Sequence, residues 1–344
     1  MRIVTVNASK SYDIKIGSGL LRSIGTDVQC LGKVQKVCII SESTVYPLYG
    51  ETVRSSLEQA GFDVYPFVFP AGEEQKTAAT YLEAINFLAE KKLTRTDLIV
   101  ALGGGVTGDL AGFLSATYLR GIRFLQVPTT LLAAVDSSVG GKTAIDLPAG
   151  KNLVGAFCQP SLVICDTDTL SSLPEEIFRD GCAEVIKYGI LYDPKLFAQL
   201  EVQGLSFDRE AVITRCVELK RDVVMEDEFD IGARMKLNLG HTIGHGVEAR
   251  SQFALSHGKS VAIGMAIVVR ASDCPDADRI LRLLKQFGLP TTIGYPVDDI
   301  LAYTLSDKKR SGNLVNLIIP KRIGECCIVP TPVENLRSFI MAGL

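Results

Sequence analysis

Short, continuously apolar runs alternate with segments of helical periodicity through the first half of the chain. The runs contain too few polar positions for strands with one face in water, so we predict a parallel sheet that is buried on both faces. The predicted strands are residues 36–40, 64–69, 98–101, 124–127 and 162–165. Helical patterns between them, as at residues 47–60, 76–91 and 108–118, predict the helices that cover the sheet. The opening residues 2–16 alternate apolar and polar positions, which predicts an antiparallel strand pair.

The pattern changes after about residue 168, where strand-like runs become scarce and helical periodicity dominates from residue 174 to residue 286. A short strand pair is predicted near the end, at residues 314–319 and 325–329. The fold class that we predict is an α/β N-terminal Rossmann-like parallel-sheet domain followed by a mainly α-helical C-terminal domain. The predicted domains are residues 1–168 and residues 169–344.

The composition is that of a folded protein without a strong charge bias. Hydrophobic residues make up 47% and charged residues 22% of the 344 positions, which excludes a disordered chain. With 36 Lys and Arg against 39 Asp and Glu, the formal net charge is −3, so nucleic acid and anionic membranes are not expected as partners. Apolar stretches fall short of the roughly 18 residues of a membrane-spanning helix, and the first residues lack the apolar segment of a signal peptide. Nine scattered cysteines without a Cys-x-x-Cys pair fit a reducing compartment, so we expect a cytoplasmic protein.

A glycine-rich turn follows the predicted strand at residues 98–101 and reads Gly103-Gly104-Gly105-Val106-Thr107-Gly108-Asp109. Glycines at a strand–helix junction let a ligand approach the backbone, and the free amide groups of the helix start can then bind phosphate. The turn therefore predicts phosphate or dinucleotide binding. Its spacing is not G-x-G-x-x-G, and a tight strand–helix turn is the alternative interpretation.

A second glycine-containing segment, residues 136–143, has the tail of an ATP-binding phosphate loop. Asp136 stands where the first glycine of that loop belongs. Its carboxylate would repel phosphate, so ATP binding is not expected. Lys142 follows two glycines and is well placed to meet an anion.

In one predicted helix of the second half, polar side chains occupy positions at which a helix normally carries apolar side chains. They are Arg234, Asn238, His241 and His245. Their spacings of +4, +3 and +4 place them within about 60° of one another on one helix face. All three histidines of the chain lie between residues 241 and 257, and this concentration predicts a metal site. Ordinary buried or surface histidines are the alternative.

Three further residues bear on this predicted site. Thr242 occupies the position of the glutamate base in H-E-x-x-H, so the histidine pair does not indicate a metalloprotease. Glu184 is the natural oxygen ligand, although a plain salt bridge to Lys187, three residues later, is the alternative. Lys220 lies on the apolar stripe of its predicted helix and therefore needs an anionic partner or ligand.

The chain resembles the 3-dehydroquinate synthase family, of the sugar-phosphate cyclase superfamily, at motifs that span nearly its whole length. They are residues 72–76 (GEEQK), 103–109 (GGGVTGD), 126–132 (QVPTTLL), 136–143 (DSSVGGKT), 150–155 (GKNLVG), 183–189 (AEVIKYG) and 237–245 (LNLGHTIGH). The resemblance implies that the first domain binds NAD⁺ on the glycine turn and that the second binds metal and substrate.

The resemblance also implies a role for individual residues. The metal, Zn²⁺ or in some members Co²⁺, is expected at Glu184, His241 and His257, which leaves His245 to contact substrate. The implied cofactor contacts are Glu42, Gly72, Glu73, Lys76, Gly105, Val106, Thr107, Gly108, Asp109, Thr129, Thr130, Lys142, Lys151, Thr169, Leu170, Ser171 and Ser172. The implied substrate and catalytic residues are Arg120, Asp136, Lys142, Asn152, Lys187, Lys220, Arg234, Asn238, His245 and Lys308. Arg120 is expected to act across a dimer interface, because family members are commonly homodimers.

The implied activity is that of a lyase in the shikimate pathway to chorismate and the aromatic amino acids. It converts 3-deoxy-D-arabino-heptulosonate 7-phosphate to 3-dehydroquinate and phosphate. The steps are NAD-mediated transient oxidation, phosphate elimination, reduction and intramolecular aldol cyclisation, so NAD⁺ is not consumed. A small substrate with one carboxylate and one phosphate accounts for the many cationic candidates on a chain of net charge −3.

Two other enzyme classes are the alternatives: another sugar-phosphate cyclase, for example one acting on sedoheptulose 7-phosphate, and a metal-dependent alcohol dehydrogenase. The chain also departs from the family pattern at three places. Lys259 stands where a glutamate is usual, Glu42 replaces the usual Asp or Asn, and the segment of residues 271–278 is shorter than usual. Lys259 follows the expected ligand His257 by two residues, so two interpretations stay open: it affects the groups that orient that ligand, or it simply faces solvent.

Overall fold

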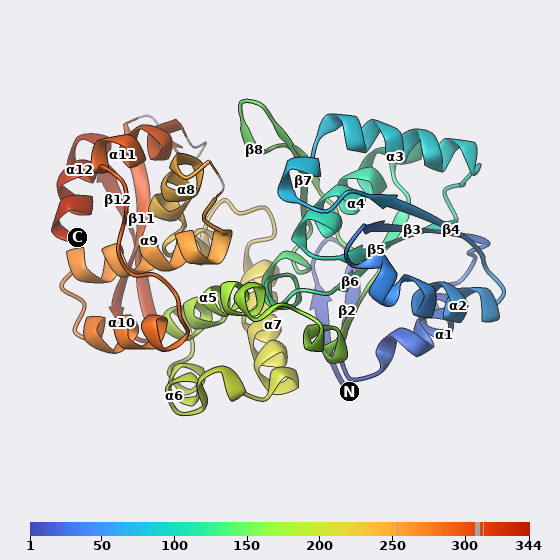
Figure 1. Cartoon of the computed structure of the whole chain (residues 1–344), viewed down its shortest axis with the longest axis horizontal. Helices are drawn as coiled ribbons and strands as arrows, with labels where there is room; N and C mark the ends of the chain where they lie inside the picture. Colours follow the sequence, from blue (N-terminus) through green and yellow to red (C-terminus); the bar gives the residue numbers. More distant parts are fainter. Residues whose placement is uncertain (253, 307–309, 312) are drawn as a thin grey trace. The chain divides into compact units, whose positions relative to one another are not determined.

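A mostly parallel sheet forms the centre of the N-terminal part of the computed structural model, which describes residues 1–252, 254–306, 310–311 and 313–344. Within these residues the sheet has seven strands (Figure 1). In spatial order they are β1 (Arg2–Asn7), β2 (Ser11–Gly17), β9 (Leu162–Asp166), β6 (Arg123–Pro128), β5 (Leu98–Gly103), β3 (Lys36–Glu42) and β4 (Asp63–Phe69). β1 pairs antiparallel with β2, and the other neighbours pair parallel, so the predicted strands and their directions are confirmed.

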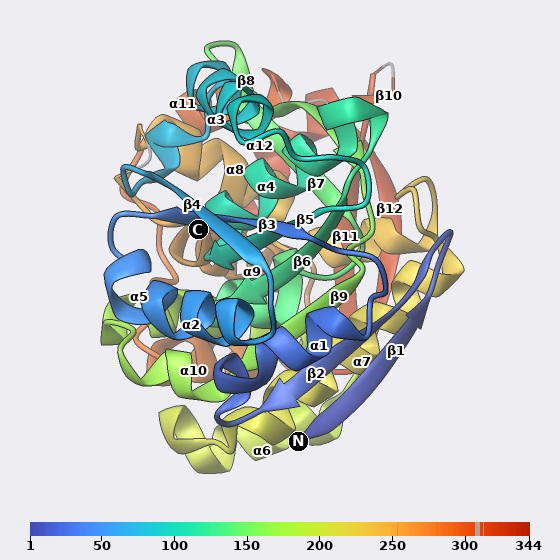
Figure 2. The same cartoon turned by 90° about the vertical axis from the view of Figure 1, so that its right-hand side faces the viewer.

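Helices cover both faces of this sheet (Figure 2). They include α1 (Ile24–Gln29), α2 (Glu51–Gln59), α3 (Ala78–Glu90) and α4 (Gly105–Thr117). α3 and α4 pack against one face, where Cys38 and Ile40 of β3 are buried. α1 and α2 pack against the other face, where Val37 and Ile39 are buried. Because successive side chains of one strand point to opposite faces, burial of both faces explains the continuously apolar sequence.

A hairpin of β7 (Lys142–Leu147) and β8 (Gly150–Phe157) adds to the sheet unit and is not predicted from the sequence. It packs on α4, and a Cβ at Gly112 of that helix would lie 2.3 Å from Cγ2 of Thr143. The Asp146 amide donates to the backbone oxygen of Lys76 at 2.7 Å. The hairpin therefore supplies side chains beside the motif at residues 72–76.

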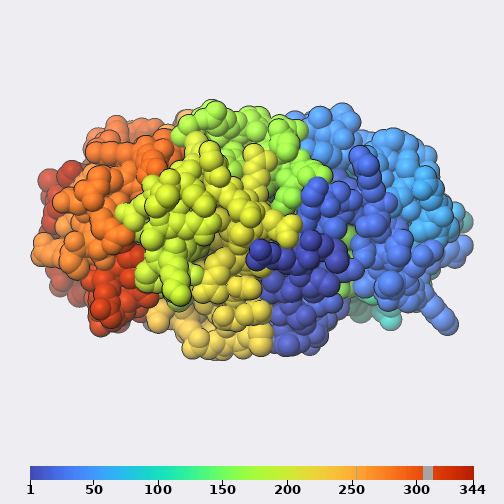
Figure 3. All heavy atoms as spheres, turned by 90° about the horizontal axis from the view of Figure 1, so that it is seen from below, coloured from blue at the N-terminus to red at the C-terminus, as the bar shows by residue number. Residues whose placement is uncertain are grey.

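The chain divides into two compact units, Met1–Pro174 with Arg209–Phe229 and Glu175–Asp208 with Asp230–Leu344. Helix α7 (Arg209–Glu226) belongs to the sheet unit because it packs against β1 and against the helical turn Ala133–Ser137. In Figure 3 the yellow segment that includes α7 lies against the dark-blue N-terminal strands. This division differs from the single predicted boundary after residue 168, since helical periodicity does not reveal the unit on which a helix packs.

The second unit is mainly helical, as predicted. Its elements are α5 (Glu175–Leu191), α6 (Pro194–Gln203), α8 (His241–Arg250), α9 (His257–Ala271), α10 (Ala277–Gln286), α11 (Val297–Ser306), α12 (Val333–Ala342) and the strands β10 (Arg310–Ser311), β11 (Leu314–Arg322) and β12 (Glu325–Pro332). β11 and β12 form the strand pair predicted near the end. α9 is almost entirely buried, because it packs against α5, α8, α10 and α12. In the part of the chain that the structure describes, no helix has both the length and the apolar character needed to cross a membrane.

Candidate metal centre and cofactor site

One carboxylate and two imidazoles meet in the second unit, each from a different helix. Glu184 lies in the buried part of α5, whereas His241 and His257 are the first residues of α8 and α9. Oε1 of Glu184 lies 3.4 Å from Nε2 of His241 and 3.3 Å from Nε2 of His257. The three potential ligand atoms all lie within 4.8 Å of one another. One carboxylate oxygen and two imidazole nitrogens facing a common point are a donor set that fits Zn²⁺ or a similar divalent ion.

The second nitrogen of each imidazole ring has its own partner. Nδ1 of His241 lies 3.1 Å from the backbone oxygen of Leu239. Nδ1 of His257 lies 3.6 Å from Oε2 of the buried Glu248. Such partners fix the ring orientation and leave Nε2 directed at the metal position.

Buried charges set the protonation of these groups. Burial alone would raise the pKa of Glu184, but the adjacent Lys187 ammonium and the His241 ring hold it well below its usual range. Burial, followed by the charge of Lys187, lowers the pKa of His241 to about 3, so its Nε2 is free to bind a cation. Burial opposes the charge on His257 as well, but the hydrogen bonds and charges of Glu184 and Glu248 raise its pKa to about 10. Binding of a metal ion at this ring would therefore displace a proton.

The polar stripe predicted on a single helix is divided between two elements. Arg234 and Asn238 lie in a short 3-10 turn, whereas α8 begins only at His241. Gly240 has a φ of 77°, and a Cβ there would lie 2.6 Å from the backbone oxygen of Val261 on α9. The prediction of one continuous helix face is wrong, because the close approach of α9 requires a glycine and a break in the helix.

All three histidine rings nevertheless gather at the site. The ring centroid of His241 lies 5.4 Å from that of His245 and 5.1 Å from that of His257. His245, Glu248 and His257 form a second group whose ligand atoms lie within 4.8 Å of one another. Glu248 is not predicted from the sequence, although this residue follows His245 by three positions and continues the spacing of the polar stripe.

Three residues predicted to bind substrate also lie in the second unit. Lys187 and Arg234 are buried, and Lys187 forms an ion pair with Glu184. Asn238 donates from Nδ2 to the backbone oxygen of Met235 at 3.1 Å. Lys308 lies outside the described residues.

In the sheet unit, the cofactor candidates follow the carboxyl ends of parallel strands. The glycine turn follows β5, and the amide of Thr129, just after β6, donates to the oxygen of Gly103 at 3.0 Å. Glu42 ends β3, where its carboxylate accepts the amides of Thr44 at 2.6 Å and Val45 at 2.9 Å. Because these strands run parallel, their carboxyl ends form one edge of the sheet, where ligands of such sheets bind.

Other cofactor candidates also follow the carboxyl ends of parallel strands. Thr130 follows Thr129 in sequence, residues 169–171 lie in the helical turn after β9, and Ser172 directly follows that turn. There the hydroxyl of Tyr49 donates to the backbone oxygen of Thr169 at 2.9 Å and contacts Ser172. Within the glycine turn, a Cβ at Gly108 would lie 2.9 Å from Oε1 of Gln126, so a larger residue there would require the Gln126 side chain to move.

A buried lysine joins the motif at residues 72–76 to the glycine turn and the hairpin. Nζ of Lys76 lies 2.9 Å from Oδ2 of Asp109 and 2.6 Å from Oδ1 of Asn152. Carboxylate oxygens of Glu73 and Asp146 each lie 3.7 Å from the same nitrogen. Burial alone would lower the pKa of Lys76, but these carboxylates, Asp109 foremost, raise it above its usual range. The structure thus brings Asn152, a predicted substrate residue, into the cluster of predicted cofactor residues.

Lys151 joins this cluster through Glu73, whereas other predicted residues of the unit make separate contacts. Nζ of Lys151 lies 3.2 Å from Oε1 of Glu73. Nζ of Lys220, on α7, lies 3.0 Å from Oδ1 of Asp136 and donates to its backbone oxygen at 2.6 Å, which supplies the expected anionic partner. The exposed Lys142 begins β7, and the exposed Arg120 has a φ of 66°.

The chain has a parallel sheet with a glycine turn at its carboxyl edge, followed by a helical unit with a Glu/His/His group. These features together define a class of nucleotide- and metal-binding enzymes. One similar solved structure is 2-deoxy-scyllo-inosose synthase complexed with carbaglucose-6-phosphate, NAD⁺ and Co²⁺. Its TM-score to this chain is 0.90 and its sequence identity is 26%, and the match covers 100% of both chains. ValA, a 2-epi-5-epi-valiolone synthase from Streptomyces hygroscopicus with NAD⁺ and Zn²⁺ bound, has a TM-score of 0.88 and 25% identity, covering 100% of this chain and 98% of its own. A butanol dehydrogenase from Thermotoga maritima shares the fold at 15% identity, with a TM-score of 0.70 and coverage of 99% and 98%.

Sequence similarity narrows the class to one family. The family models "3-dehydroquinate synthase N-terminal" and "3-dehydroquinate synthase C-terminal" match residues 66–180 and 181–310. The 3-dehydroquinate synthase of Pelobacter propionicus is 47% identical over 98% of this chain and 99% of its own length. That of Streptococcus suis is 44% identical over the same shares of the two chains. The chain belongs to the 3-dehydroquinate synthase family.

Proposed function

We propose that the chain is a lyase that converts 3-deoxy-D-arabino-heptulosonate 7-phosphate to 3-dehydroquinate and phosphate, in the shikimate pathway. The observation that carries the proposal is full-length similarity, at 44–47% identity, to relatives that bear this activity as their name. The buried Glu/His/His group and the glycine turn supply the metal and nucleotide sites that this chemistry needs.

Glu184, His241 and His257 would hold the metal, Zn²⁺ or Co²⁺, and the residues around the glycine turn would hold NAD⁺. When bound, the metal supplies Lewis acidity at the hydroxyl group to be oxidised, and NAD⁺ accepts and returns the hydride. Lys187 keeps Glu184 ionised and ready to bind the cation, since its ammonium group contacts the carboxylate in a buried environment.

The cofactor would lie along the carboxyl edge of the sheet. The amide groups at the start of α4, beginning at Gly105, would face the pyrophosphate. Lys76 would set the positions of Asp109 and Asn152 and so shape the neighbouring wall of the cofactor site. Glu73, Thr129, Thr130, Lys142, Lys151 and Thr169–Ser172 are the further contacts that we propose.

The substrate is an anion with a carboxylate and a phosphate, and cationic side chains would bind both. Those proposed are Arg120, Lys142, Lys187, Lys220, Arg234 and Lys308, with Asp136, Asn152, Asn238 and His245 as polar partners. The protein would act in the cytoplasm as a homodimer, in which Arg120 serves the partner's site.

A second cyclase activity is the competing proposal, because two solved structures with TM-scores near 0.9 are synthases of other carbocycles. The deciding assay measures phosphate release from 3-deoxy-D-arabino-heptulosonate 7-phosphate and, separately, from sedoheptulose 7-phosphate, each with Zn²⁺ and catalytic NAD⁺. We expect release from the first substrate alone, without net formation of NADH. Release from the second alone would assign the chain to another cyclase reaction. Accumulation of NADH with a simple alcohol such as glycerol would indicate an alcohol dehydrogenase.

A further inference from the structure

Two of the helices that carry predicted metal ligands touch each other next to those ligands. α5 carries Glu184, and α9 begins with His257. A Cβ at Gly258 would lie only 2.0 Å from the backbone oxygen of Asp180, which is one helical turn before Glu184. The backbones of α5 and α9 are therefore in direct contact at Asp180, so whatever holds this contact also determines how far Glu184 lies from His257.

Asp180 holds the contact with its side chain as well. Its Oδ1 accepts the backbone amide of Lys259 at 3.0 Å and the hydroxyl of Ser256. Ser256 and Lys259 lie on either side of His257 in the sequence. Ser256, the residue just before α9, makes no side-chain capping hydrogen bond of its own. The cap of α9 is thus supplied by a carboxylate from another helix, at the turn that presents the metal ligand.

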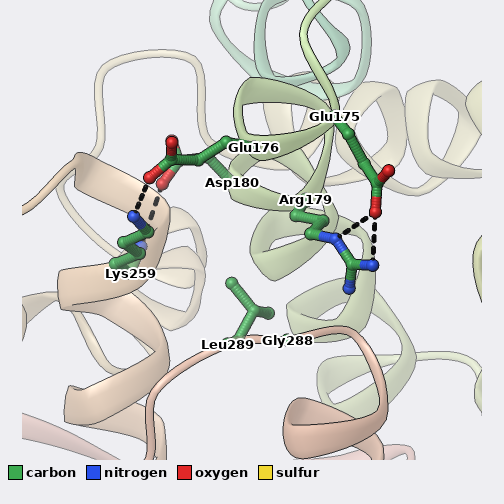
Figure 4. A pocket seen from close by; sticks show the side chains of 7 residues that line it. All are labelled: Glu175, Glu176, Arg179, Asp180, Lys259, Gly288 and Leu289. Atoms are coloured by element: carbon green, nitrogen blue, oxygen red, sulfur yellow. Dashed lines mark hydrogen bonds and ion pairs between the residues drawn. The ribbon is translucent and has the colours of Figure 1, made fainter.

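The side chain of Lys259 turns to the surface. Its ammonium group pairs with Glu176 of α5, whose side chain is 74% exposed. Figure 4 shows this pair beside a pocket of about 320 Å³ that Asp180 and Lys259 help to line. An exposed ion pair contributes little to stability. The backbone amide of Lys259, which any residue provides, makes the partly buried contact to Asp180, so the substitution of the usual family glutamate leaves this contact in place.

We propose that Asp180 is a positioning residue for the metal centre, which fixes the separation of Glu184 and His257 by holding the first turn of α9 against α5. The inference rests on the proposed function in so far as these residues bind a metal. Loss of a group that orients metal ligands weakens metal binding about 10- to 100-fold. We expect an effect of this size when the Asp180 carboxylate is removed.

The test compares Asp180→Ala and Asp180→Asn with a matched control, Asp193→Ala. Asp193 is likewise a helix-capping aspartate, although it caps its own helix, α6: its Oδ1 accepts the amides of Lys195 at 2.9 Å and Leu196 at 3.1 Å. None of the three predicted metal ligands lies on α6. Co²⁺ alone serves as the probe. Its affinity is measured by competition with a chelator, and the visible absorption of the bound ion reports the ligand geometry.

We expect Asp180→Ala to bind Co²⁺ about 10- to 100-fold more weakly and to show shifted absorption bands. Asp180→Asn keeps an acceptor oxygen and should recover most of the affinity. Asp193→Ala should lose apo-protein stability in urea to a similar extent but bind Co²⁺ like the wild type. Wild-type affinity and spectrum in Asp180→Ala would overturn the inference alone. A wild-type protein that binds no Co²⁺ would overturn the proposed metal site and the inference with it.

Discussion

Glu248 and His257 face each other at 3.6 Å, from Oε2 of the carboxylate to Nδ1 of the ring. The other ring nitrogen, Nε2, lies 3.3 Å from Oε1 of Glu184. His257 thus lies between two buried carboxylates: Glu184 at the proposed metal position, and Glu248 on the other side of the ring. A carboxylate behind a ligating histidine fixes the ring orientation and raises the basicity of the ligand.

Removal of the Glu248 carboxylate should therefore weaken metal binding without removing a ligand. We expect Glu248→Ala to lower the Zn²⁺ affinity about 10- to 100-fold, and Glu248→Gln to lower it less, because the amide oxygen still accepts the ring N–H. Competition with a chromophoric chelator measures the affinity. Glu176→Ala removes an exposed carboxylate of the same unit and serves as the control. Equal affinities in Glu248→Ala and the control would show that Glu248 has no part in orienting His257.

We expect Glu184 to be an essential metal ligand. Glu184→Gln keeps the size of the side chain but removes the charge that faces both histidines, so we expect loss of most bound zinc and of phosphate release. Glu184→Ala should do the same and should destabilise the fold further, since it also removes the side-chain oxygen that the buried Lys187 ammonium contacts. Metal content and phosphate release are measured on the same preparations. Full activity in Glu184→Gln would contradict the assignment of the metal site.

A substitution at His245 distinguishes between the two overlapping groups of potential ligands, because His245 belongs to only one of them. If the metal lies between Glu184, His241 and His257, His245→Ala should retain zinc and lose turnover, whereas His257→Ala should lose both. If the metal lies with His245 and Glu248 instead, His245→Ala should lose zinc. Zinc content by mass spectrometry of the native protein distinguishes the two outcomes, and phosphate release is measured in parallel.

The elements that the sequence predicts well are those whose burial is complete. β3 and β5 are covered on both faces, so their central residues, 37–40 and 98–102, form continuous apolar runs and the pattern is unambiguous. The β7–β8 hairpin has exposed apolar residues such as Val154 and Phe157, and its glycines suggest a loop, so periodicity does not reveal it. The helical pattern of α7 predicts a helix, but its packing on β1 is a long-range contact that no local pattern contains.

The candidate site is predictable to the extent that its residues are chemically unusual. Three histidines in one segment indicate a metal site, because histidines rarely cluster in a sequence for other reasons. Spacing alone does not tell His245 from His257 as a ligand, because the break at Gly240 and the chain between α8 and α9 decide which nitrogen faces Glu184. Asp180 carries no such signal, since an aspartate near a helix start is common and its partner lies on another helix.

Asp97 makes a pH-dependent contribution to the stability of the sheet unit. The buried carboxylate accepts the amides of Thr94 at 2.6 Å, Lys36 at 2.9 Å and Gln35 at 3.2 Å. Burial alone would raise the pKa of Asp97, but these hydrogen bonds lower it. A depressed folded-state pKa stabilises the protein above the unfolded-state pKa of about 4, and this stabilisation is lost as the pH falls through the folded-state pKa.

Asp97→Asn should therefore lower the free energy of unfolding at pH 7 by about 1–3 kcal/mol, because an amide cannot accept all these N–H groups. The difference from wild type should shrink as the pH falls below about 4, because the carboxylate of the unfolded wild type then takes up a proton while that of the folded protein is still ionised. Urea unfolding at several pH values checks both statements. A difference that stays constant from pH 7 to about pH 3 would show that ionisation of Asp97 does not contribute.

We expect Lys76 to have both a structural and a cofactor-related role, and a double substitution can separate the two. Lys76→Met leaves the carboxylate of Asp109 without its closest cation, so we expect the free energy of unfolding to fall by about 3–5 kcal/mol. We also expect NAD⁺ to bind at least about tenfold more weakly, since Asp109 and Asn152 lose the group that positions them. Lys151→Met removes only a partly exposed ion pair with Glu73 and should cost about 1 kcal/mol or less.

The double variant Lys76→Met/Asp109→Asn removes both charges of the buried pair. It should recover much of the stability, because the unpaired buried carboxylate is gone. Its NAD⁺ affinity should stay low, because neither the lysine nor the aspartate is left to shape the cofactor site. Urea unfolding of the apo-protein and calorimetric titration with NAD⁺ give the two quantities independently. Recovery of NAD⁺ affinity together with stability would mean that Lys76 acts on the fold alone.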